Sequence, residues 1–184
     1  MNAKENLREE HAACMRIFTV LQKICERIKK NEEGLREPLE RIISFLEVYV
    51  DQCHHEKEER FLFPALVDVE IPGIKGLIGE LRLEHQTGRT LVREMKTQIE
   101  GFYGGTELSP SKLVDIPKQY IGIFRKHIRR ENAELLPQIG IGLSEQKRAW
   151  LSEQFERIEN EQIGRHRYEA FREMSRKPVR LTAI

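Results

Sequence analysis

Apolar residues recur every three or four positions along most of the chain, the period expected of helices that bury one face. Four such stripes run over residues 7–28, 39–65, 74–99 and 113–135. Glycine and proline interrupt the pattern between the stripes, and no segment alternates apolar and polar residues at period two. Four long helices with short connections predict an all-α fold, an antiparallel up-down four-helix bundle.

An additional C-terminal helix is expected after the fourth stripe. Ser144 is suited to cap the start of this helix, and Trp150, Phe155 and Ile158 supply its apolar positions. Gly164 interrupts the pattern, and the sequence from residue 171, FREMSRKPVRLTAI, is basic and typical of a loose tail. We therefore predict a bundle over residues 1–140 and a C-terminal helical extension with a basic tail over residues 141–184.

Each of the four apolar stripes contains a histidine at a core position, and two of them contain a glutamate one turn later. A buried ionised carboxylate is costly unless it is paired or bound to a metal. A histidine and a glutamate four residues apart lie on one helix face and can share one ion. One such histidine would usually be an ordinary core residue, but the whole cluster predicts a metal site. The candidate metal ligands are His11, His54, Glu58, His85, His127 and Glu131.

The candidate ligands belong to an internal repeat. The segments HHEKEERFLFP and HIRRENAELLP share the frame His-x-x-x-Glu-(x)5-Pro at a separation of 73 residues, and REEH and RLEH are separated by 74 residues. Each half of the chain is thus a helical hairpin with the same ligand types, and two hairpins would pack about a pseudo-twofold axis. Two equivalent ligand sets indicate two metal ions, with the glutamates as bridges. Pro64 and Pro137 are expected where each liganding helix ends or kinks.

Other polar residues near the stripes have alternative roles. His55 begins a second histidine–glutamate pair on a poorer apolar stripe, and is either a supplementary ligand or a boundary residue. Glu84 and Arg89 flank the third histidine, and either support the ligands from outside or form a solvated pair. Tyr120 is expected to pack in the core, and His166 to lie on the surface. Three cysteines without a Cys-x-x-Cys motif predict reduced core thiols: Cys14, Cys25 and Cys53.

Over about residues 5–140 the chain resembles the hemerythrin-like family of HHE cation-binding domains. The segments HHEKEERFLFP, EHQTGR and HIRRENAELLP carry the resemblance. It implies a hemerythrin-like bundle and a non-haem di-iron centre of two iron ions with an oxo or hydroxo bridge. The ligands implied are His11, His54, Glu58, His85, His127 and Glu131, with Glu58 and Glu131 bridging. Histidine and carboxylate ligands also suit manganese or zinc.

The chain departs from the ligand pattern of oxygen-carrying hemerythrins, which have five histidines and His-x-x-x-His on the third helix. Here Arg89 stands four residues after His85, so the site is one imidazole short. His55, a water molecule, Glu10 or Glu84 could fill that position. More exchangeable coordination positions favour a site that reacts with or senses O2, peroxide or nitric oxide. Ferritin-like di-iron proteins use Glu-x-x-His, and this chain contains no such motif.

Three functions follow from this ligand set. The first is a di-iron protein that binds, senses or reacts with O2 or a related small ligand such as peroxide or nitric oxide. The second is a redox enzyme or an iron-donating repair factor for iron–sulfur centres, with a redox partner that the sequence does not identify. The third is an interaction module with a structural metal.

Charge and hydropathy limit the other partners. Charged residues make up 33% of the 184 residues, but the two signs nearly cancel at a formal net charge of +1. Nucleic-acid-binding proteins typically carry a basic excess, so we expect no nucleic-acid partner. No run of about 18 apolar residues is present, and the N-terminus, MNAKENLREEH, lacks the apolar core of a signal peptide. We expect a cytoplasmic protein without a membrane partner, either a monomer or a homodimer.

Overall fold

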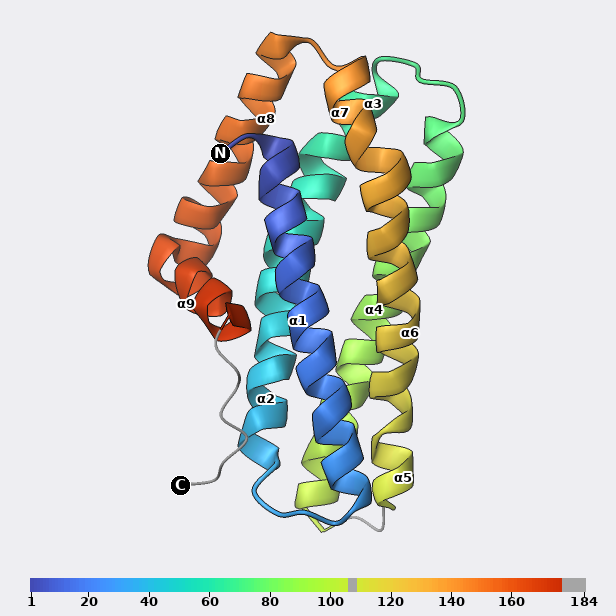
Figure 1. Cartoon of the computed structure of the whole chain (residues 1–184), viewed down its shortest axis with the longest axis vertical. Coiled ribbons are helices and arrows are strands. Elements are labelled where there is room, and N and C mark those ends of the chain that lie inside the picture. The colour runs from blue at the N-terminus through green and yellow to red at the C-terminus, as the bar shows by residue number, and fades with distance from the viewer. Residues whose placement is uncertain (106–108, 177–184) are drawn as a thin grey trace.

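The computed structural model describes residues 1–105 and 109–176, and within these ranges every regular element is a helix. Four helical arms run up and down beside one another (Figure 1). The first arm is α1 (Ala3–Lys29), and the third arm is α4 (Ile74–Tyr103). The all-α bundle predicted from the apolar stripes is confirmed.

The second and fourth arms are composite, because α-helical and π-helical segments follow one another along each. The second arm comprises α2 (Arg36–Ser44), the π-helices η1 (Phe45–His55) and η2 (Glu58–Leu62), and α3 (Phe63–Val67). The fourth arm comprises α5 (Pro110–Leu113), α6 (Asp115–Arg130), the π-helix η3 (Glu131–Leu135), and α7 (Leu136–Gly142). The repeat found in the sequence therefore corresponds to a repeated change of helix type.

The two prolines of the repeat do not end their helices. The second arm continues past Pro64 to Val67, and the fourth arm continues past Pro137 to Gly142. A proline inside a helix has no N–H to donate and displaces the carbonyl of the preceding turn. In both arms the segment just before the proline is π-helical, and π-helical turns are frequent at functional sites. Each repeated proline therefore coincides with a local distortion of its helix and not with the end of the helix.

Local signals in the sequence set several helix starts. The side chains of Asn2, Ser109 and Ser144 each accept a hydrogen bond from the backbone N–H three residues later, which satisfies a donor that the helix leaves free. Gly73 precedes α4 with φ at 78°, a left-handed conformation that glycine adopts without a steric penalty. These residues fix where α1, α5, α8 and α4 begin.

The apolar core consists of two clusters, one toward each end of the bundle. One contains Leu7 and Leu81, and the other contains Phe18 and Tyr120. The core histidines lie between these residues along their helices, for example His11 between Leu7 and Phe18 on α1. A polar layer therefore separates two apolar halves, and both halves exclude water from it.

The C-terminal extension packs against the first two arms. It comprises α8 (Glu145–Arg157), the π-helix η4 (Ile158–Gly164) and α9 (Arg165–Arg176), drawn in orange to red in Figure 1. Gly164, at φ 88°, separates the last two segments. Residues 171–176 are the last turns of α9 rather than the loose tail expected from the sequence, because Phe171 packs against the core. The rest of that tail, residues 177–184, lies outside the described residues.

Several smaller predictions can be compared with the structure. Cys14, Cys25 and Cys53 are buried free thiols, and Tyr120 is buried, as predicted. His166 is exposed, also as predicted. Among the described helices, none combines the length and the apolar character needed to cross a lipid bilayer. The division into a bundle over residues 1–140 and an extension from residue 141 stays a prediction.

Candidate metal centre

The structure brings all six predicted ligand residues together in the polar layer of the bundle. Each is at most 2% exposed. Their side chains form two groups in which the potential ligand atoms lie within 4.8 Å of one another, and Glu58 and Glu131 belong to both groups. The first group adds His11 and His54 to the two glutamates, and the second adds His85 and His127. Two histidine pairs thus lie on either side of two shared carboxylates.

The atoms that face one another are the Nε2 atoms of the imidazoles and the glutamate oxygens. The Nε2 atoms are 3.2 Å apart within each pair, His11 with His54 and His85 with His127. Glu131 places one oxygen 3.1 Å from Nε2 of His11 and the other 3.0 Å from Nε2 of His127. Glu131 therefore reaches both groups at once, which is the geometry required of a bridging carboxylate.

Each of the four imidazoles has an oxygen partner on its outer nitrogen. Nδ1 of His54 lies 2.9 Å from Glu10, and Nδ1 of His127 lies 2.6 Å from Glu84. The other two contacts join Nδ1 of His85 to Glu59 at 2.7 Å and Nδ1 of His11 to the amide oxygen of Asn132 at 3.1 Å. Because these oxygens accept hydrogen bonds, the neutral form of each ring carries its proton on Nδ1 and turns the Nε2 lone pair inward.

The inward lone pairs have no donor to meet. Within residues 1–105 and 109–176, all four carboxylate oxygens of Glu58 and Glu131 are buried without a hydrogen-bond partner. Buried polar atoms are normally satisfied, and an orphaned set of this size requires an explanation. Four imidazole lone pairs and two carboxylates that converge in a dry layer match the donor set of a metal site. The residues present therefore fit a bound cation.

The electrostatics of the metal-free site show how protons balance the charge when no cation does so. Burial and the neighbouring Glu131 raise the pKa of Glu58 well above its usual range. Although burial opposes the charged imidazolium, Glu131 and Glu84 raise the pKa of His127 to about 9. Burial lowers the pKa of His54 to about 4, so this imidazole is neutral at pH 7 and ready to ligate.

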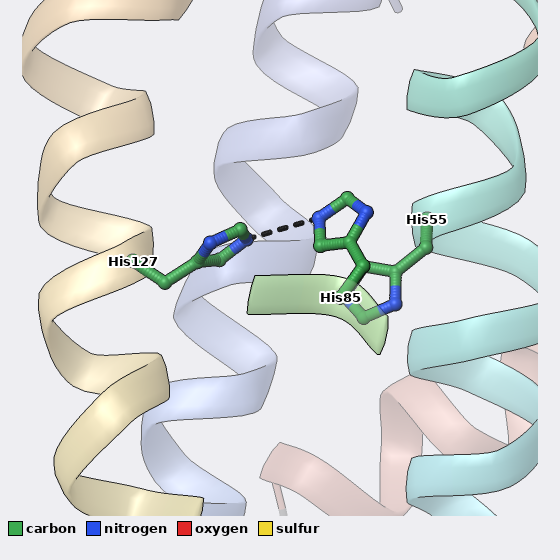
Figure 2. Close-up of side chains that lie close together, drawn as sticks. All are labelled: His55, His85 and His127. Atoms are coloured by element: carbon green, nitrogen blue, oxygen red, sulfur yellow. Dashed lines mark hydrogen bonds between the residues drawn. The ribbon is translucent and has the colours of Figure 1, made fainter. Parts of the chain in front are cut away.

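His55 is the seventh candidate, and the structure buries it rather than leaving it at the boundary. Its ring stacks on that of His85 at a centroid distance of 3.8 Å, and it forms a third possible metal group with His85 and His127. Figure 2 shows the three rings converging from three different helices. Burial lowers the pKa of His55 well below its usual range, so the ring is neutral. His55 thus lies beside the second histidine pair, where an imidazole is missing.

The other residues considered for the missing ligand are engaged elsewhere. Glu10 and Glu84 contact the outer nitrogens of His54 and His127, so they support these imidazoles from outside. Arg89 donates to Glu59 and to Asp51 at 2.7 and 2.6 Å, and so holds the partner of His85 rather than forming a solvated pair. His55 or a water molecule remains for the open position.

Sequence reasoning missed Glu59 and Asn132 as partners of the ligand histidines. Both directly follow a glutamate of the repeat, Glu58 or Glu131. Glu10 and Glu84 likewise directly precede the repeated histidines His11 and His85. The signal was therefore present in the repeat, whose matched polar positions extend one residue beyond the ligands themselves.

A surface cavity reaches the same region from outside. It has a volume of about 430 Å³, lies between the second arm, α4 and α6, and is lined in part by His55, Arg89 and Tyr120. His55 therefore has one face toward the cavity region and one against His85. A small molecule in the cavity would be separated from the second histidine pair by a single side chain.

Comparison with known proteins agrees with the geometry. The hemerythrin HHE cation-binding domain model matches residues 2–139, which is most of the chain. The chain therefore belongs to the hemerythrin HHE cation-binding domain family, and its fold is a hemerythrin-like helical bundle with extra helices.

The comparison with curated proteins adds more distant relatives. The chain is 22% identical over 164 residues to uncharacterised proteins of Mycobacterium bovis and of two strains of Mycobacterium tuberculosis. The match covers 89% of this chain and 64% of each relative, so the chain spans less than two thirds of their length. No solved structure matches the chain.

Proposed function

We propose that this protein is a non-haem di-iron protein that binds, senses or reacts with O2 or a related small ligand such as peroxide or nitric oxide. The observation that carries the proposal is the pair of buried histidine–glutamate groups that share Glu58 and Glu131. Two ions that share two carboxylates would each have two imidazoles from the six predicted ligands. Iron, when bound, would supply the redox and ligand-binding chemistry.

The choice of iron rests on the donor set and the family. Imidazole nitrogen and carboxylate oxygen suit iron, manganese and zinc, and no thiolate is directed at the site to select a softer ion. Cys14 is the nearest cysteine along α1, but burial and the nearby carboxylates Glu10 and Glu131 raise the pKa of its thiol well above its usual range. A neutral thiol is a poor metal ligand.

We propose a small ligand because little space is available at the site. The site is enclosed by two apolar clusters, and the route from the cavity passes His55. The second histidine pair lacks the further imidazole that would close its coordination, and Arg89 is held away by Glu59 and Asp51. Diatomic molecules and peroxide fit such a position, whereas a larger substrate would require the helices to separate.

Optical spectra of the iron-loaded protein test the proposal. We expect the anaerobically reduced protein to lack near-ultraviolet charge-transfer bands and to gain them on exposure to air, peroxide or nitric oxide. A Glu58→Gln, Glu131→Gln double variant removes both proposed bridges while keeping side-chain shape, and it should give no such bands. Wild-type protein whose spectrum does not respond to any of the three ligands would contradict the proposal.

A second candidate function is a redox enzyme that consumes peroxide or nitric oxide. The observation that favours it is the position beside His55, which no imidazole of the six-residue set occupies. Turnover of peroxide or nitric oxide by iron-loaded protein, measured with a matched zinc-loaded control, separates this function from binding alone. Reversible ligand binding without turnover would reject the enzyme and leave the sensor or carrier.

A further inference from the structure

The carboxylate of Glu10 lies at the centre of a buried network that joins the metal centre to the C-terminal extension. One oxygen accepts the Nδ1–H of His54 at 2.9 Å. The other oxygen accepts from Lys57 Nζ at 2.5 Å and from the hydroxyl of Tyr168 on α9 at 2.9 Å. Both Glu10 and Lys57 are fully buried, so these protein groups, rather than solvent, determine where the carboxylate lies.

Lys57 is held from the other side by the same extension. Its ammonium donates to Glu159 of η4 at 2.8 Å and to the amide oxygen of Asn6 at 2.8 Å, and Asn6 in turn donates to Glu159 at 2.7 Å. A buried ammonium is stable only when it is paired and hydrogen-bonded. Glu159 therefore balances the lysine that aligns Glu10, from a position 102 residues further along the chain.

Glu84, which occupies the position equivalent to Glu10 in the other half of the bundle, has different partners. Glu84 supports His127 as Glu10 supports His54, but its second partner is Arg130, which is 30% exposed and lies on the same arm as His127. No residue of the extension touches Glu84 among the contacts of the described chain. The two halves thus have matched imidazoles, but only the Glu10 half depends on the extension.

We propose that the C-terminal extension completes the metal centre, with Tyr168 and Glu159 as positioning residues that fix the Glu10 carboxylate and, through it, the tautomer and orientation of His54. Both residues lie beyond the segment that matches the family domain, residues 2–139. The metal-binding part of this inference rests on the proposed function. The positioning of His54 does not, because the contacts that carry it exist in the metal-free chain.

Two conservative variants of the full-length protein test the inference. Tyr168→Phe removes only the hydroxyl that reaches Glu10. Glu159→Gln removes the charge that balances Lys57 and that also pairs with Arg165 at 3.6 Å, the arginine that the Glu169 control shares. The matched controls are Tyr103→Phe, at the far end of α4, and Glu169→Gln, whose carboxylate pairs with Arg165 and Arg172 near the surface of α9. Thermal melting confirms that each variant folds.

The first readout uses metal-free protein and nitrogen-15 NMR of the histidine rings, with the His54 signals assigned by their loss in His54→Gln. We expect wild-type protein and both controls to show His54 protonated on Nδ1. Tyr168→Phe and Glu159→Gln should shift the His54 ring signals toward a mixture of tautomers, while those of His127 stay unchanged. Unchanged His54 signals in both variants would overturn the inference, whatever the protein binds.

The second readout is anaerobic competition for Fe²⁺ between the protein and a chelator. Loss of the outer hydrogen-bond partner of a ligand histidine typically weakens metal affinity about 10- to 100-fold. We expect such a loss in one of two binding steps for Tyr168→Phe and Glu159→Gln, and in neither step for the controls. Wild-type affinity in both steps would overturn the inference. If wild-type protein bound no iron, the proposed function would fail, and the NMR readout would still decide the role of the extension.

Discussion

The ligand imidazoles owe their direction to the hydrogen bonds on their outer nitrogens. Glu10, Glu84, Glu59 and Asn132 each accept one Nδ1–H, and this directs each Nε2 atom toward the two shared carboxylates, Glu58 and Glu131. Without a cation, protons must reduce the repulsion, which is why the pKa values of Glu58 and His127 are raised. The metal-free site is therefore partly protonated at pH 7.

Metal binding should consequently release protons. The pKa of His127 is about 9, so His127 is protonated at pH 7 in the metal-free protein, and the pKa of Glu58 is shifted upward as well. Because a ligand must be deprotonated to bind, we expect Fe²⁺ to displace at least one proton per chain at pH 7, and fewer at pH values above the pKa of His127. Anaerobic titration calorimetry in buffers of different ionisation enthalpy measures the number. A binding heat at pH 7 that is the same in every buffer would contradict this prediction.

His55 offers a separate test at the residue scale. His55→Phe keeps a ring that can stack on His85 but removes both nitrogens. We expect this variant to weaken one iron-binding step about tenfold. This is the lower end of the loss of metal affinity that follows when a group supporting a metal ligand is removed. The exposed His166→Phe serves as the control. Chelator competition and the spectrum of the loaded protein are the measurements. Unchanged values would show that His55 only packs, and that solvent fills the open position.

At the scale of the helices, the repeated frame His-x-x-x-Glu-(x)5-Pro places each of the two shared glutamates at the start of a π-helical segment, η2 or η3. The apolar stripes correctly placed His54 and Glu58 on a core face, because the helical period fixes which residues share a side. The sequence left open whether His55 lies among the ligands or at the boundary of the core. Adjacent residues of an α-helix face different directions, but the π-helical segment η1 (Phe45–His55) shifts that phase and buries both histidines.

The contacts of the extension could not be predicted from the sequence for a different reason. Lys57 lies between two ligand candidates and reads as a solvated helix residue, yet it is fully buried. Its partner Glu159 is 102 residues away, and no local period relates the two positions. Such a pair depends on how α8, η4 and α9 pack against the first two arms, which only the tertiary structure shows.

The close approach of α4 and α6 depends on Gly88. A Cβ atom at this position would lie 2.3 Å from the ring of Phe124, which in turn packs near His127. We expect Gly88→Ala to destabilise the protein by about 1–3 kcal/mol through overpacking, and to weaken iron binding by displacing Phe124. Chemical denaturation and chelator competition measure the two effects.

Gly79 is the matched control on the same helix. A Cβ atom there would meet nothing within 4 Å. Gly79→Ala should stabilise the protein by about 0.5–1 kcal/mol, because alanine is the better helix former. If Gly88→Ala were as stable as Gly79→Ala, the helices would not need the glycine for their packing.

For the molecule as a whole, we expect the buried histidine–glutamate groups to oppose folding when no metal is bound. Burying two carboxylates side by side costs stability, and replacing such a group by one without charge is often neutral or favourable. We expect the melting temperature of metal-free Glu58→Gln to be equal to or higher than that of metal-free wild-type protein. The corresponding gain in the free energy of unfolding should be about 1 kcal/mol. The same variant should gain less stability than the wild type on adding Fe²⁺. A lower melting temperature for the metal-free variant would show that Glu58 stabilises the fold itself.

The bundle supplies matched histidine pairs, and within residues 1–105 and 109–176 the extension supports only one of them. This asymmetry predicts two iron-binding steps of different strength, both of which need Glu58 and Glu131. The most direct measurement is an anaerobic titration of metal-free protein with Fe²⁺, with bound iron counted per chain. We expect saturation at two iron ions per chain. Saturation at one ion, or no binding at all, would contradict the shared-carboxylate centre.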